Sequence, residues 1–320
     1  RRPDHRPDLP PAGQGGVRVT TRTWTRLRRA VAARGFTPAT WIPVASEGRA
    51  EAATIKPARV LEDLPLSGHP VGPPEPWPGS VAFLDGIQRY EVMAYAGASP
   101  VVVAEIAAAV LERRDRQLHV ARVARQRLVI ARAGVLDELT DAIEGHDAVE
   151  LSDEGPAHPV HDFLLARREV DAARGRLEVQ VGHGYRAHSD AWLIIDGSLT
   201  ESPQWARDSR MLGIAKSHST LPFADADLEA YLRLPAGHRS PIFEPAGRDV
   251  APVHSWALRL WPWEGKDLLH GLIRVEAQAS LDTLAQADQI SRWLLAERAP
   301  VSTPDPRWDR LLYGIRAVEE

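Results

Sequence analysis

Two short segments of the chain share one pattern: a run of large apolar residues, then Asp, then Gly. They cover residues 81–86 (VAFLDG) and 192–197 (WLIIDG). Apolar runs of this length, bounded by turn residues, are typical of strands buried inside a sheet. The chain is therefore constrained to a fold in which two buried strands end in aspartates, Asp85 and Asp196, that lie at the edge of a sheet.

Two aspartates at the ends of neighbouring strands carry a chemical implication. An ionised carboxylate there is costly unless it is paired, hydrogen-bonded or bound to a cation. Two carboxylates side by side repel each other, and a Mg²⁺ or Mn²⁺ ion between them removes the repulsion. The following glycine allows a tight turn and a close approach by substrate. Because Asp-Gly is also a common turn after any strand, the pattern alone leaves two ordinary turns as an alternative to a metal site.

The remaining pattern predicts an α/β domain over residues 76–320. Residues 1–75 are expected to form a disordered tail, a basic helix and a Pro-rich linker. Within the domain, the Ala-rich continuation after PVVVAEI is compatible with a helix, and residues 117–133 are ambiguous. We expect a helix rich in Arg and Glu at 160–181, a strand at 191–198, another at 211–219, a strand pair at 256–262 and 271–279, and two helices towards the C-terminus.

Several further residues could take part in phosphate or metal chemistry. Lys216, downstream of the second Asp-Gly, could neutralise a phosphate, or it could protect an edge strand from aggregation. Glu169 and Glu178 lie nine residues apart and on opposite faces of the predicted helix, so one of them is expected to reach the aspartates. Apolar neighbours favour Glu169, and Glu178 has an ordinary i,i+4 partner in Arg174, so periodicity leaves the choice open. The candidates for phosphate contact on strands are Arg89, Arg259 and Arg274, with surface salt bridges as the alternative.

Composition and missing motifs exclude other classes. The absence of cysteine rules out disulfides, thiolate metal sites and cysteine nucleophiles. The motifs GxxxxGK[ST], GxGxxG, GxSxG and HExxH do not occur, which disfavours P-loop NTPases, dinucleotide-binding enzymes, serine hydrolases and zinc peptidases. A formal net charge of -4 gives no global basic field, so contact with nucleic acid must depend on local patches. With no apolar run long enough for a signal peptide or a membrane span, we expect a cytoplasmic protein without membrane contact.

The order FLDGIQR, DAWLIIDGSL and GIAKSHST, with a Glu-bearing helix before the second Asp-Gly, resembles the NurA nucleases. The resemblance covers roughly residues 80–320 and implies an RNase H-like mixed sheet flanked by helices. It also implies cleavage of DNA with Mn²⁺ or Mg²⁺, expected as two ions. Proteins of this family work as homodimers with the hexameric HerA translocase, a ring ATPase, in DNA end processing or anti-phage defence.

The resemblance also assigns roles. Asp85 and Asp196 match the family's metal aspartates, and Lys216 matches the lysine of the next strand. The spacing of the family's glutamate favours Glu178 over Glu169 as the further metal ligand. Near the C-terminus the family carries a Tyr-Pro and a later histidine. Here Asp305 replaces the tyrosine, and Tyr313 stands near the histidine position.

This departure leaves two alternatives. Either the ligand set has changed while keeping oxygen donors, with Asp305 as a metal ligand, or the protein is a catalytically weak or inactive RNase H-like subunit that scaffolds the translocase complex. We favour the first, because both aspartates and the lysine remain. An enzyme that acts on RNA is a third hypothesis.

Overall fold

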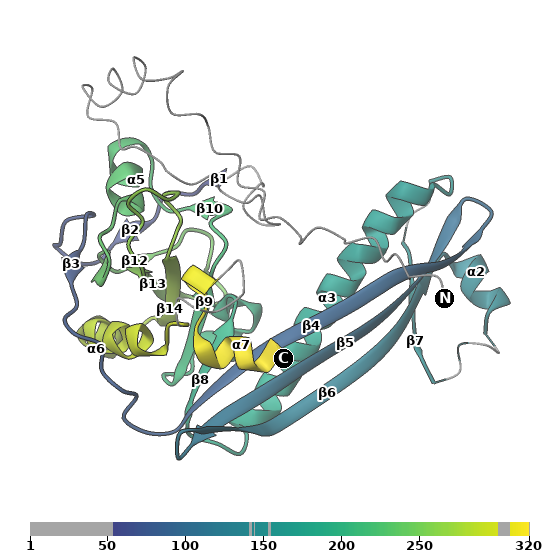
Figure 1. The fold of residues 1–320 in the computed structure, drawn as a ribbon. Coiled ribbons are helices and arrows are strands. Elements are labelled where there is room, and N and C mark those ends of the chain that lie inside the picture. The colour runs from purple at the N-terminus through teal and green to yellow at the C-terminus, as the bar shows by residue number, and fades with distance from the viewer. Residues whose placement is uncertain (1–53, 141–142, 144, 153–154, 300–307, 320) are drawn as a thin grey trace, which may run out of the picture.

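Three long strands dominate the computed structural model, which describes residues 54–140, 143, 145–152, 155–299 and 308–319 (Figure 1). These strands are β4 (Val81–Ala96), β5 (Ser99–Arg114) and β6 (Gln117–Ala131), and they form an antiparallel meander. They extend well beyond the rest of the sheet, so only the first residues of β4 have neighbours on both sides.

The sheet continues on the other side of β4 with short buried strands. β8 (Trp192–Asp196) pairs with β4 in parallel, and β9 (Met211–Ala215) pairs in parallel with β8. Antiparallel β14 (Leu272–Gln278) and β13 (Val253–Arg259) follow. An antiparallel meander followed by two parallel strands gives the mixed sheet of an RNase H-like α/β fold, which confirms the predicted fold class.

Helices cover both faces of this sheet. α3 (Pro159–Arg186) packs against β4, β5 and β6; His158 caps it by accepting hydrogen bonds from two backbone amides, and a proline occupies its first turn. α6 (Leu281–Glu297) and α7 (Tyr313–Glu319) lie on the other face, with apolar residues of both in the core on that side. No helix within the described residues is both long enough and apolar enough to cross a membrane.

Side-chain alternation along β4 separates the two cores. Ala82 and Leu84 are buried in the core shared with α3, whereas Val81 and Phe83 are buried in the core shared with α6 and α7. Since successive side chains of a strand point to opposite faces, Asp85 follows Phe83 onto the side of α6 and α7. The local sequence therefore sets the face on which the first aspartate is found.

The Ala-rich segment after residue 100 is a strand and not the helix that its composition allowed. In β5 the alternating residues Ala104, Ile106, Ala108 and Val110 are all buried against α3. Pairing with β4 on one edge and β6 on the other satisfies the backbone of this segment along its length. Tertiary pairing thus overrides the helix propensity of alanine.

Residues 54–75 pack onto the body, although a linker is expected there. β1 (Thr54–Ile55), β2 (Arg59–Val60) and β3 (His69–Pro70) each pair with a strand of the domain, and Glu62 forms an ion pair with buried Arg239, 2.6 Å between Oε2 and Nη1. The predicted basic helix and tail lie outside the described residues. The other short elements are β7 (Asp147–Glu150), β10 (Thr220–Leu221), β11 (His238–Arg239), β12 (Phe243–Glu244), α2 (Ala133–Glu138), α4 (Pro203–Ala206), α5 (Asp225–Leu232), η1 (Leu199–Glu201) and η2 (Trp308–Arg310).

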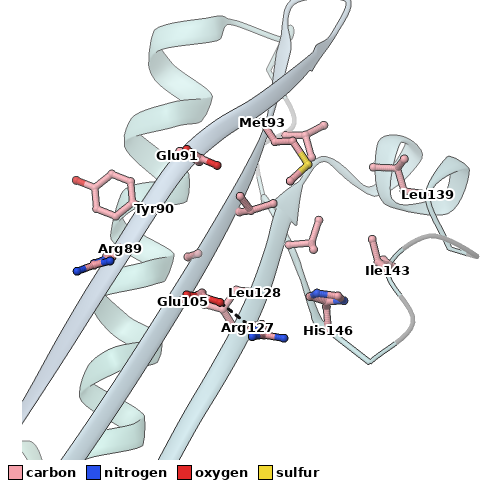
Figure 2. A pocket seen from close by; sticks show the side chains of 14 residues that line it. Arg89, Tyr90, Glu91, Met93, Glu105, Arg127, Leu128, Leu139, Ile143 and His146 are labelled. Carbon is pink, nitrogen blue, oxygen red and sulfur yellow. Dashed lines mark hydrogen bonds and ion pairs between the residues drawn. The ribbon is translucent and has the colours of Figure 1, made fainter.

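An apolar pocket of about 600 Å³ lies on the long strands, near α2 (Figure 2). Met93, Leu139 and Ile143 contribute apolar side chains, and Met93 is 65% exposed. Glu105 and Arg127 form an ion pair of 3.0 Å at its edge. The pocket is on the extended part of the strands, several residues beyond Asp85 along β4.

Candidate metal centre

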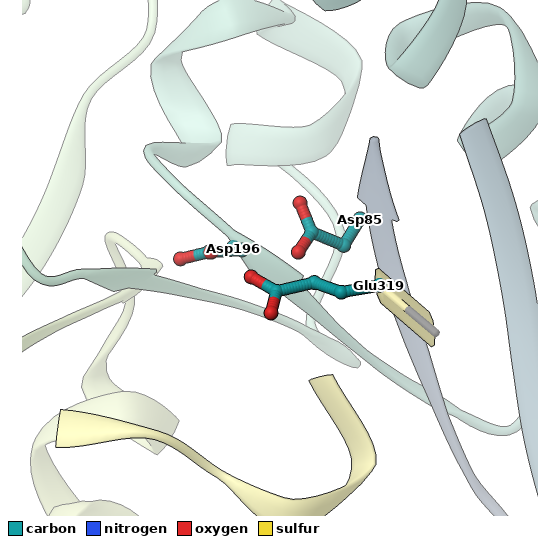
Figure 3. Close-up of side chains that lie close together, drawn as sticks. All are labelled: Asp85, Asp196 and Glu319. Carbon is teal, nitrogen blue, oxygen red and sulfur yellow. The ribbon is translucent and has the colours of Figure 1, made fainter. Parts of the chain in front are cut away.

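Three acidic side chains converge where β4, β8 and α7 meet (Figure 3). Asp85 comes from β4, Asp196 from the end of β8, and Glu319 from α7. One carboxylate oxygen of each lies within 4.8 Å of the others, so a single cation could contact all three. The geometry is that of a site built from oxygen donors only.

The register of two parallel strands places the aspartates side by side. Leu84 of β4 pairs with Ile195 of β8, so the next position on each strand is the aspartate. The prediction that Asp85 ends its strand is wrong, because β4 continues through Gly86 to Ala96 in register with β5. What ends at Asp85 is the pairing with β8, and this leaves a crevice at the edge of the parallel pair.

α7 brings the third carboxylate by packing directly on β4. Gly314 faces the ring of Phe83, and a Cβ at this glycine would lie 2.3 Å from ring carbons. Leu312 and Ile315 are fully buried in the same core. Glu319 follows Ile315 by four residues, so it lies on the same face of the helix, one turn further on.

Sequence reasoning did not predict Glu319. The available signal was the set of apolar residues Leu311, Leu312 and Ile315, just before and within the C-terminal helix, whose spacing is continued by Glu319. The local sequence does not show that this face of the helix packs on β4, the strand that carries Asp85.

Electrostatic repulsion is concentrated on Asp85, which is 5% exposed. Burial and the neighbouring charge of Asp196 raise the pKa of Asp85 well above its ordinary value, while Lys216 and the amide of Gly86 oppose the rise. The amide of Gly86 donates to Oδ1 of Asp85 at 2.7 Å. A cation bound here would remove the repulsion and favour the ionised form of both aspartates.

Lys216 lies at the position predicted for it, directly after β9. Its Nζ is 2.7 Å from Oδ2 of Asp196, and both side chains are largely buried, 12% and 20% exposed. The lysine therefore places a positive charge against one carboxylate of the cluster. A lysine ammonium has three donors, so contact with Asp196 leaves others for a ligand.

Glu178 approaches the cluster from the α3 side of the sheet. A Cβ on Gly86 would lie 2.3 Å from Oε1 of Glu178, so the glycine leaves the space that this carboxylate fills. Glu178 also pairs with Arg174. Burial raises the pKa of Glu178; Arg174 opposes the rise, and the charge of Asp196 adds to it.

Glu169 is placed away from this position. It precedes Glu178 by nine residues in the same helix, which is roughly 13.5 Å along the axis. The structure therefore places Glu178, and not Glu169, against Gly86, the residue that follows Asp85.

The two glycines after the aspartates serve different purposes. Gly197 has a φ of +138°, in the range that favours glycine, so the chain turns there after β8. Gly86 is inside a continuous strand and instead makes room for Glu178. The tight turn expected from the sequence is present at the second Asp-Gly and absent at the first.

Of the three arginines predicted to bind DNA, Arg259 cannot do so in this fold, and that prediction is wrong. Its side chain is fully buried and donates to the carbonyl oxygens of four residues, Leu232, Leu234, Leu268 and His270. Burial lowers the pKa of Arg259 to about 10. The guanidinium holds together the loops around β13 and presents no donor to solvent.

The other two arginines differ in exposure. Arg89 is exposed on β4 and lines the apolar pocket of Figure 2, four residues beyond Asp85. Arg274 is largely buried on β14, where its Nη2 lies 3.2 Å from Oε1 of Glu276. Asp305, the predicted C-terminal ligand, lies outside the described residues. Tyr313 is 55% exposed at the start of α7, six residues before Glu319 and not among the clustered acids.

Comparison with known proteins found solved structures but no family. No protein-family model matches the chain, and no curated protein matches it. The NurA nuclease from Sulfolobus solfataricus is 12% identical over 74% of this chain and 79% of that chain, with a TM-score of 0.46. The catalytic domain of human endonuclease V, a cysteine-substituted variant, is 13% identical over 85% of this chain and 89% of that chain, with a TM-score of 0.30. Similarity at this level does not define a family or an activity.

Proposed function

We propose that this protein is a divalent-metal-dependent DNA nuclease. The observation that carries the proposal is the convergence of Asp85, Asp196 and Glu319, from three separate elements, with carboxylate oxygens within 4.8 Å of one another. Partly buried carboxylates are rarely gathered in this way unless a cation compensates them. Lys216 supplies one positive charge at Asp196, and Arg174 supplies another at Glu178.

The donor set fits a hard cation. All four acids offer oxygen ligands, which Mg²⁺ and Mn²⁺ prefer, and the chain has no cysteine to form a thiolate site. Asp85, Asp196 and Glu319 would hold the metal, with Glu178 as a further oxygen ligand, and we propose two ions. When bound, such ions act as Lewis acids on the phosphate and lower the pKa of a bound water to near neutrality.

The remaining chemistry belongs to side chains of the protein. Lys216, held 2.7 Å from Asp196, can donate to a non-bridging oxygen of the scissile phosphate and so stabilise negative charge that develops there. Arg174 keeps Glu178 oriented towards Gly86 through their ion pair. Gly197 keeps the end of β8 free of a side chain, which allows the backbone of a nucleic acid to approach closely.

DNA as substrate, and a ring ATPase as partner, are part of the same proposal. Their support is the resemblance of FLDGIQR, DGSL and GIAKSHST to the NurA pattern, together with the net charge of -4. A protein without a global basic field gains from a homodimer that encloses DNA or from a HerA-type hexamer that delivers it. We propose DNA end processing or anti-phage defence as the setting.

Purified protein incubated with linear double- and single-stranded DNA tests the proposal. We expect cleavage with Mn²⁺ or Mg²⁺ and none after EDTA, because the acidic cluster then lacks its cations. RNA and RNA–DNA hybrids in parallel reactions identify the preferred nucleic acid. Absence of cleavage with either metal, even with a HerA-type ATPase present, would contradict the proposal and leave a scaffolding subunit.

Conservative replacement of single glutamates identifies the further metal ligands. We expect Glu178→Gln and Glu319→Gln each to reduce the cleavage rate by roughly 10–100-fold or more. That range is typical for loss of a residue that only supports a metal ligand, and loss of a ligand itself should cost at least as much. Glu169→Gln, at a half-buried position of the same helix as Glu178, is the matched control and should keep activity within about twofold. Dependence of the rate on Mn²⁺ concentration measures the effect. A loss confined to Glu169→Gln would exclude the proposed ligand set.

A further inference from the structure

A second polar site lies next to the turn that follows Asp196. It is a small pocket of about 130 Å³, lined by three basic side chains and by backbone of the loop after β12. The basic residues are exposed Lys56, half-buried Arg248 and largely buried Arg274, and no acidic residue is among those that line the pocket. We call this the basic pocket.

Hydrogen bonds connect the basic pocket to the metal centre through one short segment. Ser198, two residues after Asp196, donates from Oγ to Oε2 of Glu276 at 2.6 Å, and the amide of Leu199 donates to the same oxygen at 3.0 Å. The other oxygen of Glu276 pairs with Arg274. Glu276 is fully buried, so its carboxylate is held between the turn after Asp196 and a wall of the pocket.

A second connection runs through hydroxyl groups. Thr200 Oγ1 lies 2.7 Å from Ser198 Oγ, and Arg248 donates to the same Thr200 oxygen. Gly213 supports the turn from below: a Cβ there would lie 2.8 Å from the carbonyl oxygen of Gly197. These contacts therefore fix the position of the pocket relative to Asp196, the aspartate that ends β8.

Size and charge indicate the ligand. A cavity of about 130 Å³ is well below the roughly 300–1,000 Å³ typical of small-molecule sites, and it suits one oxyanion group. Glu276 pairs with Arg274, and the described residues offer no ion-pair partner to Lys56 or Arg248, so the pocket is positively charged. Nε of Arg274 is buried without a hydrogen-bond partner among the described residues, a donor still to be satisfied.

We propose that the basic pocket binds a phosphodiester group of the DNA strand at a fixed distance from the scissile phosphate. The proposal rests on the nuclease function above and adds a substrate contact to it. Lys56 and Arg248 supply charge and donors, and an arginine fork matches the oxygens of a phosphate. A phosphate seated there would set the register of the strand across Ser198, so that a defined backbone position lies at Asp196.

Binding of a fluorescent single-stranded oligonucleotide tests this, measured by anisotropy with Ca²⁺ in place of Mn²⁺ over a range of NaCl concentrations. For Lys56→Gln and Arg248→Gln we expect weaker binding and a slope of log K against log salt that is smaller by about 0.7, the value for one phosphate contact on a single strand. The KM for DNA cleavage should rise in both variants as affinity falls. Arg168→Gln, which removes an exposed arginine of α3, is the matched control and should keep the wild-type slope.

The outcomes separate the pocket from the nuclease. If wild-type protein cleaves DNA and both pocket variants bind like Arg168→Gln, the basic pocket has no phosphate role and the inference fails alone. If wild-type protein neither binds nor cleaves nucleic acid, the proposed function fails with it. Calorimetry with inorganic phosphate and with dTMP gives a further arm. Tight binding of either, lost in Arg248→Gln, would assign the pocket to a free phosphate compound and overturn the inference.

Discussion

Replacing Asp196 with asparagine is expected to lower metal-dependent DNA cleavage on the order of 10³-fold, equivalent to about 4 kcal/mol of transition-state stabilisation. The substitution keeps the size of the side chain and removes the charge that Asp85 and Glu319 share with it around the proposed cation. It also takes away the ion-pair partner of Lys216, 2.7 Å from the carboxylate. Both changes remove charge from the position where a phosphate is expected to react.

Asp190→Asn is the matched control for this variant. Asp190 is exposed, lies just before β8, and is not one of the clustered acids. Cleavage of linear DNA with Mn²⁺ should be close to wild type in this control, and thermal unfolding of both variants checks that each is folded. Wild-type activity in a folded Asp196→Asn protein would rule out the acidic cluster as the catalytic centre.

Replacing Asp162 with asparagine is expected to cost about 3 kcal/mol of folding free energy, the lower part of the range for removing one partner of a buried ion pair. Asp162 is fully buried in the first turn of α3. Arg132 donates to both of its oxygens, at 2.7 and 2.8 Å, and Ser99 donates from Oγ at 3.4 Å. Without the carboxylate, the buried ion pair with Arg132 is lost, and the helix loses a favourable negative charge at its N-terminus.

The same pair gives a dependence on pH with a definite sign. Hydrogen bonds from Arg132 lower the pKa of Asp162 below its ordinary value. A group whose pKa is lowered by folding contributes its full stability above the unfolded pKa, near 3.9 for aspartate, and loses it as pH falls through the folded pKa. The difference in unfolding free energy between wild type and Asp162→Asn should therefore be largest near pH 7 and should shrink below about pH 4.

Urea unfolding at neutral and acidic pH measures this difference. Asp147→Asn, at an exposed position of β7, is the control and should change stability by less than about 0.5 kcal/mol at either pH. An Asp162→Asn deficit that is the same at both pH values would show that packing, and not charge, explains it. Because α3 carries Glu178 at its other end, cleavage by this variant reports whether its N-terminal anchor matters to the site.

Local sequence patterns were sufficient to predict an element where the burial of its side chains follows the period of that element. The strand at 191–198, the helix at 160–181 and the strand pair β13–β14 all agree with their periodicity, because burial of one stripe or one run leaves a clear signal. The Ala-rich β5 was ambiguous for the opposite reason. Alanine favours a helix locally, and the strand exists because β4 and β6 supply hydrogen bonds on both edges.

Arg259 shows a similar limit for charged residues. In sequence it is an arginine within an apolar strand, a pattern shared by a surface phosphate contact and a buried structural cation. The structure decides between them: four carbonyl oxygens, from the end of α5 and from loops before and after β13, accept hydrogen bonds from the guanidinium. The spacing of residues within the strand does not predict these four hydrogen-bond acceptors.

For the candidate site, the sequence by itself determined Asp85 and Asp196. Each ends an apolar run, and the alternation of side chains along a strand assigns both to one face once the strands are paired. Only the tertiary structure decided what surrounds them. Parallel pairing placed Leu84 opposite Ile195, and the packing of Gly314 on Phe83 brought in Glu319. The missing side chain at Gly86 made room for Glu178. Periodicity is a property of neighbours along the chain, whereas a metal centre depends on distances between distant segments, which only packing sets.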